Sequence, residues 1–199
     1  SEIGQLINLT YLHLHTKVVP PQIGQCTNLM HLRLGGNQIE EIPPEIGQLT
    51  SLVIFGAGSN QIEKIPPEIS QLTNLTLISL EDNQIQTIPP EFGQLRQLLE
   101  LNVWNNLVDV IPPEIGCLSK LTSLELGTNR ITSIPSNITQ LNQLTDLHLS
   151  FNHISELPKD LFQMARLEIL NLESNSIQSL PDQIKNLNCK TYFFIRKIH

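Results

Sequence analysis

Apolar residues recur along this chain in one arrangement that repeats from end to end. It is clearest in the segment 72–94, LTNLTLISLEDNQIQTIPPEFGQ, where leucine or isoleucine stands at fixed positions among polar residues. An asparagine marks the same point of successive copies, and its position number rises by 23 each time: Asn37, Asn60, Asn83, Asn106, Asn129, Asn152 and Asn175. A fixed period of about 20 to 50 residues indicates a repeat architecture.

The spacing of the copies is regular with one exception. Counted from the first leucine of the pattern, copies begin at Leu6, Cys26, Leu49, Leu72, Leu95, Leu118, Leu141, Met164 and Leu187. The interval between these starting positions is always 23, except for the first, which is 20. In that short copy the segment HTKVVPP has lost the asparagine and the isoleucine that normally follows it. We therefore expect the first turn to differ from the others.

Each copy has two halves with different patterns. In the first half, as in 75–80, Leu75, Ile78 and Leu80 are expected to face inward, the last two at the alternation of a short β-strand. The second half begins with proline, carries an acidic residue next and turns one Ile or Phe inward, which favours a short helical or 3₁₀ turn. All 13 prolines fall in this slot, which supports the assignment.

Together the two halves predict a solenoid, because one turn cannot bury its apolar stripe without stacked neighbours. We predict an α/β fold, a curved right-handed solenoid with a parallel β-sheet on the concave face. Short helical, 3₁₀ or irregular turns should form the convex face. A single domain is expected over residues 1–199, with about eight repeats and a partial ninth strand at 190–196. Because the chain opens inside a repeat, we expect it to be a fragment of a longer one.

The consensus LxxLxxLxLxxNxIxxIPxxIGx resembles the leucine-rich repeat, and the resemblance covers essentially the whole chain. Its 23-residue, proline-bearing variety is similar to intracellular repeats: Shoc-type Ras scaffolds, the Scribble/Erbin group, plant Ras-group proteins and Roco GTPases. The glycine insertion of the extracellular plant type, NxLxGxIP, is missing. The resemblance implies a cytoplasmic signalling protein that binds another protein, with small GTPases or phosphatase subunits as partners. It also implies that the asparagines hydrogen-bond the backbone of adjoining turns.

Charge and hydropathy exclude several other classes. The net charge is −7, from 12 basic and 19 acidic residues without a block of like charge, which disfavours nucleic acid and anionic membranes as partners. No apolar run approaches the roughly 18 residues of a membrane span. The start, SEIGQLINL, does not have the features of a secretory signal.

The three cysteines, Cys26, Cys117 and Cys189, bear on the compartment. Cys26 occupies a leucine position and should be buried. Cys26 and Cys117 lie four turns apart, or about 19 Å at roughly 4.8 Å per strand, which is beyond disulfide reach. Reduced thiols favour an intracellular compartment. Three Asn-x-Thr sequons, at Asn8, Asn74 and Asn137, point weakly to the outside of the cell.

We find no constellation for catalysis, and we predict a monomer that is no enzyme and binds no cofactor. The segment 56–61, GAGSNQ, lacks the lysine and Ser/Thr of a phosphate-binding loop. An acidic column has a structural explanation, since a carboxylate in the first turn after proline suits the helix dipole. That column consists of Glu2, Glu45, Glu68, Glu91, Glu114 and Asp160.

The variable residues on the outward side of the strands are the candidate binding residues, because side chains alternate along a strand. They form three zones of different chemistry. The His/Arg zone contains Tyr11, His13, His15, His31 and Arg33. The glycine zone contains Gly35, Gly36, Gly56, Gly58 and Ser59. The acidic zone contains Glu81, Asp82, Glu100, Asn102, Trp104, Glu125, Asp146 and His148. The histidines have no carboxylate nearby, so a metal site is not predicted.

Trp104 is the only tryptophan, and tryptophan is enriched among interface anchors. Our hypothesis is that Trp104 and the acidic residues around it bind a basic protein segment. In the competing interpretation, Trp104 merely covers neighbouring side chains. Two other function classes stay open. One is a ligand-sensing module of a larger Roco GTPase, kinase or ubiquitin ligase, and the other is an extracellular recognition receptor.

Overall fold

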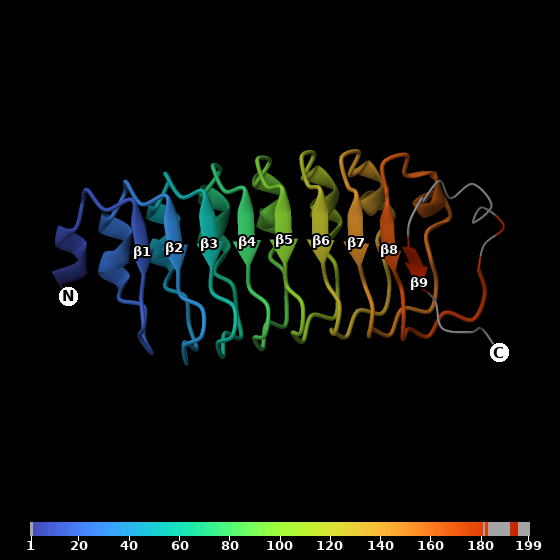
Figure 1. The fold of residues 1–199 in the computed structure, drawn as a ribbon, viewed down its shortest axis with the longest axis horizontal. Coiled ribbons are helices and arrows are strands. Elements are labelled where there is room, and N and C mark those ends of the chain that lie inside the picture. Colours follow the sequence, from blue (N-terminus) through green and yellow to red (C-terminus); the bar gives the residue numbers. More distant parts are fainter. Residues whose placement is uncertain (1, 181, 183–191, 195–199) are drawn as a thin grey trace.

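The computed structural model describes residues 2–180, 182 and 192–194, the last three by their backbone alone. In Figure 1 the strands stand side by side in chain order, with short helices in a second layer behind them. The strands are β1 (Tyr11–His13), β2 (His31–Arg33), β3 (Ile54–Gly56), β4 (Leu77–Ser79), β5 (Glu100–Asn102), β6 (Ser123–Glu125), β7 (Asp146–His148), β8 (Ile169–Asn171) and β9 (Tyr192–Phe194). The 3₁₀-helices are η1 (Glu2–Gln5), η2 (Pro21–Gln25), η3 (Pro44–Gln48), η4 (Pro67–Gln71), η5 (Pro90–Gln94), η6 (Pro113–Cys117), η7 (Ser136–Gln140) and η8 (Lys159–Gln163).

All nine strands of the described residues belong to one parallel sheet in sequence order. The register is constant, so that the middle residue of each strand lies beside the middle residue of the next, as in Leu12↔Leu32 and Leu32↔Phe55. This open, curved parallel sheet with 3₁₀ turns confirms the predicted fold class. Of the predicted ninth strand at 190–196, only β9 lies within the described residues.

The core is one continuous layer between the sheet and the helices, and most of its members are Leu and Ile. Leu75, Ile78 and Leu80 are fully buried, as the alternation predicts, and so is Phe92 from the helical half of the same repeat. Each such side chain contributes about 1.5–3 kcal/mol by leaving water. Cys26 is fully buried in its leucine position, and its thiol donates to the Ile3 carbonyl oxygen over 3.2 Å.

The helical layer is made from the proline slot. In η3, Pro43 precedes the helix in an extended conformation and Pro44 is its first residue, where proline loses no hydrogen bond. Glu45 lies in the first turn of this helix, where the acidic column was expected. Leu49 closes the helix by donating its amide to the Ile46 carbonyl. No helix in the described part of the chain is long and apolar enough to cross a membrane.

Asparagines join the turns on the other side of each strand. The Asn106 side chain donates to the carbonyl oxygens of Leu80 (3.0 Å) and Val103 (3.2 Å), and it accepts from the Ile85 amide (2.9 Å). Leu80 and Ile85 belong to the preceding turn, so the link runs toward the N-terminus. The residue before it, Asn105, has φ 52°, which turns the asparagine inward. Equivalent left-handed residues are Gly36, Ser59, Asp82, Thr128, Phe151 and Ser174.

The short first turn keeps this link despite its deletion. The three missing residues fall between Leu14 and Thr16, so Thr16 stands where Ile39 stands in the next turn. The Asn37 side chain still donates to the Leu14 carbonyl (2.9 Å) and accepts from the Thr16 amide (3.0 Å). The Thr16 hydroxyl then donates to the Val18 carbonyl (2.8 Å), which closes the shortened loop. The first turn therefore has an irregular loop, but the asparagine hydrogen bonds that join it to the second turn are those of the other turns.

Candidate partner-binding face

The outward positions of the sheet form columns, because every strand has the same register. Neighbouring members of a column are about 4.8 Å apart, the spacing of paired strands. One column begins each strand, a second ends it, and a third lies two residues further along the chain. In the acidic zone these columns are occupied by Glu100, Ser123 and Asp146; by Asn102, Glu125 and His148; and by Trp104, Gly127 and Ser150.

The side chains of the His/Arg zone lie on β1 and β2, except for His15, which lies two residues beyond β1. The Tyr11 and His31 rings meet edge-on, 5.9 Å between centroids, and the Arg33 guanidinium lies 5.6 Å from the Tyr11 ring centroid. The His13 and His15 rings lie 4.7 Å apart. All five predicted residues of this zone are thus neighbours. In the described residues no group of three or more His, Cys, Asp or Glu side chains is placed to hold a metal ion.

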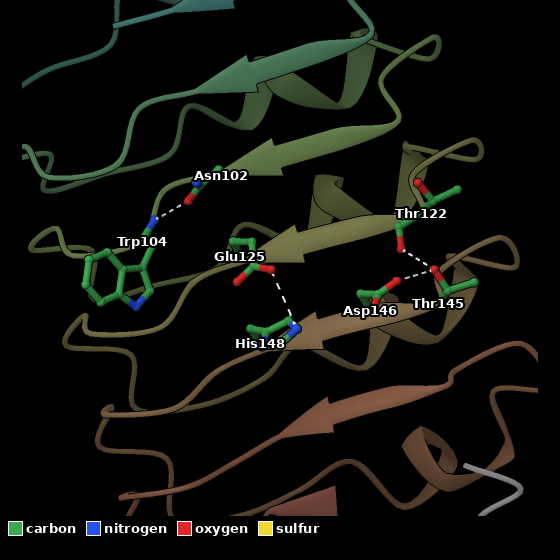
Figure 2. Close-up of polar contacts among 7 residues, drawn as sticks. All are labelled: Asn102, Trp104, Thr122, Glu125, Thr145, Asp146 and His148. Carbon is green, nitrogen blue, oxygen red and sulfur yellow. Dashed lines mark hydrogen bonds and ion pairs between the residues drawn. The ribbon is translucent and has the colours of Figure 1, made fainter. Parts of the chain in front are cut away.

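Glu125 is at the centre of the acidic zone (Figure 2). Its Oε1 lies 3.6 Å from Nε2 of His148 on the next strand, and both side chains are partly exposed. Burial raises the pKa of the Glu125 carboxyl above its ordinary value; His148 opposes this rise, and the nearby carboxylate of Asp146 adds to it. The Glu125 carboxyl group is therefore ionised less readily than a fully solvated one, and a cation from a partner would stabilise its ionised form.

The remaining acids of the zone differ in their surroundings. Asp146 is held beside the Thr145 hydroxyl, which also contacts the Thr122 carbonyl oxygen at 3.0 Å (Figure 2). Glu100 is exposed on β5. Asp82 lies beyond the strand at φ 56°, and its carboxylate accepts from the Asn105 side chain over 2.7 Å. Asp82 thus joins neighbouring loops at the rim, whereas Glu100, Glu125 and Asp146 form the acidic floor.

Trp104 lies over a glycine. A β-carbon built on Gly127 would be 2.8 Å from Cδ1 and 3.0 Å from Nε1 of the indole, so the ring covers the Gly127 backbone. The side chain nevertheless stays 41% exposed. Its backbone amide donates to Oδ1 of Asn102 over 3.0 Å (Figure 2). The indole N–H makes no hydrogen bond with any residue that the structure describes, although it lies on the edge of the ring nearest Gly127.

Several outward apolar residues of this face were missed in the sequence, among them Ile169 on β8. Phe151 is 56% exposed and takes the left-handed position before Asn152, with φ 56°. Its signal was visible, since the equivalent residues in the other turns are small or polar. Ile54 on β3 and Leu77 on β4 face outward and are half-buried. Neither could be separated by type from the inward aliphatic residues beside it.

Comparison with known families agrees with this architecture. A family model described as "Leucine rich repeat" matches residues 96–154 and 142–195. A second model, "Leucine Rich Repeat", matches residues 28–49 and 74–95. The chain belongs to the leucine-rich repeat family. No curated protein sequence matches it.

Several solved structures share the fold over nearly the whole chain. A leucine-rich repeat protein of Leptospira interrogans is 34% identical, with a TM-score of 0.73, over 94% of this chain and 54% of its own. The plant peptide hormone receptor RGFR1, solved in complex with RGF2, is 28% identical with a TM-score of 0.87, over 94% of this chain and 32% of its own. The Arabidopsis receptor kinase HAESA, solved with the peptide hormone IDA and the co-receptor SERK1, is 27% identical with a TM-score of 0.86, over 96% and 34%. The chain therefore spans little more than half, or about a third, of these relatives.

Proposed function

We propose that this repeat domain is a non-catalytic module that binds a basic protein segment through its concave face. Trp104 is the apolar anchor of this site, and Glu100, Glu125 and Asp146 supply the charge. The observation that carries the proposal is the seating of the Trp104 ring over Gly127 with its indole N–H unused by the described residues. A ring that is already held in place loses little entropy when a partner packs on it.

Charge on this face supports a basic partner. The Glu125 carboxylate lies 3.6 Å from the His148 ring, and burial already disfavours its ionised form. A lysine or arginine of the partner would stabilise that carboxylate and complement the neighbouring Glu100 and Asp146. Phe151 extends the apolar part of the site on the far side of Gly127 from Trp104. An aromatic anchor beside acidic groups suits a basic segment that also has apolar side chains.

The finer proposal is an intracellular signalling scaffold with a small GTPase or phosphatase subunit as partner, acting as a monomer in the cytoplasm. The 23-residue repeat type supports it, as do the free thiols of buried Cys26 and exposed Cys117. A second candidate is peptide recognition outside the cell. Similarity to RGFR1 and HAESA, both solved with peptide ligands, supports that candidate. Glycans at Asn8, Asn74 or Asn137 on the protein from its native source would decide for the second.

The test is affinity capture from the source cells, comparing the unaltered chain with Trp104→Ala and with a Glu100→Gln, Trp104→Ala, Glu125→Gln triple variant. We expect Trp104→Ala to weaken the affinity for the captured partner by about 2 kcal/mol, or roughly thirtyfold, and the triple variant to lose it. The matched control is Val110→Ala, which removes an exposed apolar side chain that is not on a strand. Equal recovery by all variants would reject the site around Trp104. A Trp104→Ala variant that melts lower but binds equally well would make the ring structural.

A further inference from the structure

The glycine zone forms a hollow in the concave face. It has a volume of about 390 Å³ and lies over β2, β3 and β4, with His13 of β1 at its edge. Arg33, Gly56 and Ser79 form one row across these strands, and Gly35, Gly58 and Glu81 lie two residues further along. Glycine is unfavourable inside a strand, and there it often marks a position that a ligand or another backbone approaches closely.

Three of the glycines have a local reason, and Gly56 has none. Gly36 has φ 71°; a β-carbon on Gly35 would lie 3.3 Å from the Gly58 carbonyl oxygen; and one on Gly58 would meet the Glu81 carboxylate. A β-carbon on Gly56 would have no atom within 4 Å, and its φ is that of an ordinary strand residue. The fold therefore has room for a β-carbon at this position. Neither packing nor backbone conformation therefore explains why position 56 is a glycine.

The walls of the hollow carry opposite charges. Arg33 lies at one corner, with its guanidinium against the Tyr11 ring, and it has no ion-pair partner among the described residues. Glu81 lies at the opposite corner, where its carboxylate accepts from the Ser79 hydroxyl and has no cation beside it in the described part of the chain. The half-buried side chains of Ile54 and Leu77 form the apolar side.

The spacing of these charges matches an extended peptide. From strand spacing and rise per residue, the Arg33 and Glu81 backbones are about 12 Å apart, two strands across and two residues along. In an extended segment, residues at i−2, i and i+2 face the same side, and the outer two are about 13 Å apart. An acid, a large apolar residue and a base at these positions would reach Arg33, the space above Gly56 and Glu81 together.

We propose that the hollow is an anchor subsite for an extended partner segment that has a large apolar residue with an acid two positions to one side and a base two positions to the other. The apolar side chain packs on Gly56 between Ile54 and Leu77, and the flanking charges pair with Arg33 and Glu81. This inference rests on the proposed function, because it assigns a second subsite on the same concave face. It differs in its ligand, which must carry both signs of charge.

The experiment selects random linear peptides against the unaltered domain and then measures the affinity of the selected peptides for four variants. Gly56→Val places an apolar side chain in the hollow, its β-carbon has no atom within 4 Å, and valine suits a strand. Ser123→Val places the same side chain on the same face at β6 and is the control. Arg33→Glu and Glu81→Lys each reverse the charge on one wall of the hollow. Melting temperatures show whether each variant folds, and Gly56→Val should melt at or above the temperature of the unaltered chain.

We expect the selected peptides to have the acid, apolar, base pattern. Their affinity for the Gly56→Val variant should be about thirtyfold lower than for the unaltered domain, and their affinity for Ser123→Val should be unchanged. Selection against Arg33→Glu should replace the acid by a base, and selection against Glu81→Lys should replace the base by an acid. Peptides that bind Gly56→Val and Ser123→Val equally well but depend on Trp104 would overturn the hollow and leave the proposed function standing. Peptides that are lost on Gly56→Val and unaffected by Trp104→Ala would support the hollow and count against the Trp104 site. Recovery of no peptide above background would overturn the hollow as well.

Discussion

At the end of β3 the outward position is occupied by Gly56, which has no side chain, and at the same position of β6 by Glu125, yet the backbone hydrogen bonds beneath them are the same. Under the glycine zone, Asn60 donates to Leu34 and Ala57 over 2.9 and 3.0 Å and accepts from the Ile39 amide over 3.0 Å. Under the acidic zone, Asn129 makes the three equivalent bonds, at 2.9, 3.2 and 2.9 Å. The frame is thus constant while the surface changes from hollow to charged. Binding properties can vary along this chain without any change in how its turns are joined.

The largest effect is expected from removing the asparagine hydrogen bonds under the glycine zone and under the acidic zone. Asn60→Ala and Asn129→Ala each remove hydrogen bonds to two carbonyls, which keep one donor from a neighbouring asparagine. Each also leaves one amide of the core, that of Ile39 or Val108, without an acceptor, so each should lower the free energy of unfolding by about 3 kcal/mol. The measurement is the urea denaturation midpoint of each variant. The control is Asn28→Ala, which removes one exposed hydrogen bond, from Asn28 to the Ile7 carbonyl. A clear difference between Asn60→Ala and Asn129→Ala would contradict a frame that is independent of the surface.

A medium effect is expected from comparing glycines of the two faces. A β-carbon on Gly116, in η6, would lie 2.5 Å from the Asn137 carbonyl oxygen of the next turn, whereas one on Gly56 meets nothing. Gly116→Ala should therefore destabilise the protein by about 2 kcal/mol through overpacking. Gly56→Ala should stabilise it by about 0.5 kcal/mol, because it lowers the entropy of the unfolded chain. Thermal unfolding of both variants checks this, and a Gly56→Ala variant that melts well below the unaltered chain would show a structural need for that glycine.

The smallest effect concerns the acidic zone and pH. Because the pKa of Glu125 is raised above its ordinary value of 4.5, its contribution to stability is complete below that pH and is lost as the pH rises through the folded-state value. Glu125→Gln should therefore become more stable relative to the unaltered chain as the pH rises from acidic to neutral. The gain should stay under about 1 kcal/mol, since the pair with His148 is partly exposed and is lost too. Urea midpoints across this range measure it, with Glu100→Gln as the control for one lost acidic charge, and an opposite trend would contradict it.

The fold could be predicted from the sequence because the same pattern occurs in every repeat. Asparagine at a constant interval and proline in one slot indicate where each strand and helix lies, and a single odd copy cannot obscure that. The first turn shows the limit of such a prediction. Its three-residue deletion was visible, but the use of the Thr16 amide in place of the missing isoleucine depends on a contact made 21 residues away by Asn37.

The candidate site could be predicted only in part. Alternation placed Trp104, Glu125 and His148 on the outward side, but the seat of the Trp104 ring on Gly127 depends on a side-chain rotamer and on a glycine of the following repeat. Leu77 could not be assigned because Leu75, Ile78 and Leu80 surround it with the same residue type. The hollow forms because Gly56 on β3 has no side chain, and its charged residues, Arg33 and Glu81, come from the neighbouring repeats. A pattern read along the chain does not reveal such a shape.

The asparagine links have a direction, and this direction bears on how the protein is made. Each asparagine fastens its own turn to the one before it, so a turn receives its fastening from the residues that follow it in the chain. During synthesis the N-terminal turns leave the ribosome first, and each would be secured as soon as the next asparagine emerges. Folding can then advance from the N-terminus one turn at a time as the chain leaves the ribosome, because each repeat contacts only its neighbours. The growing end, where the last turn still waits for its successor, would be the loosest part of the nascent chain at every stage.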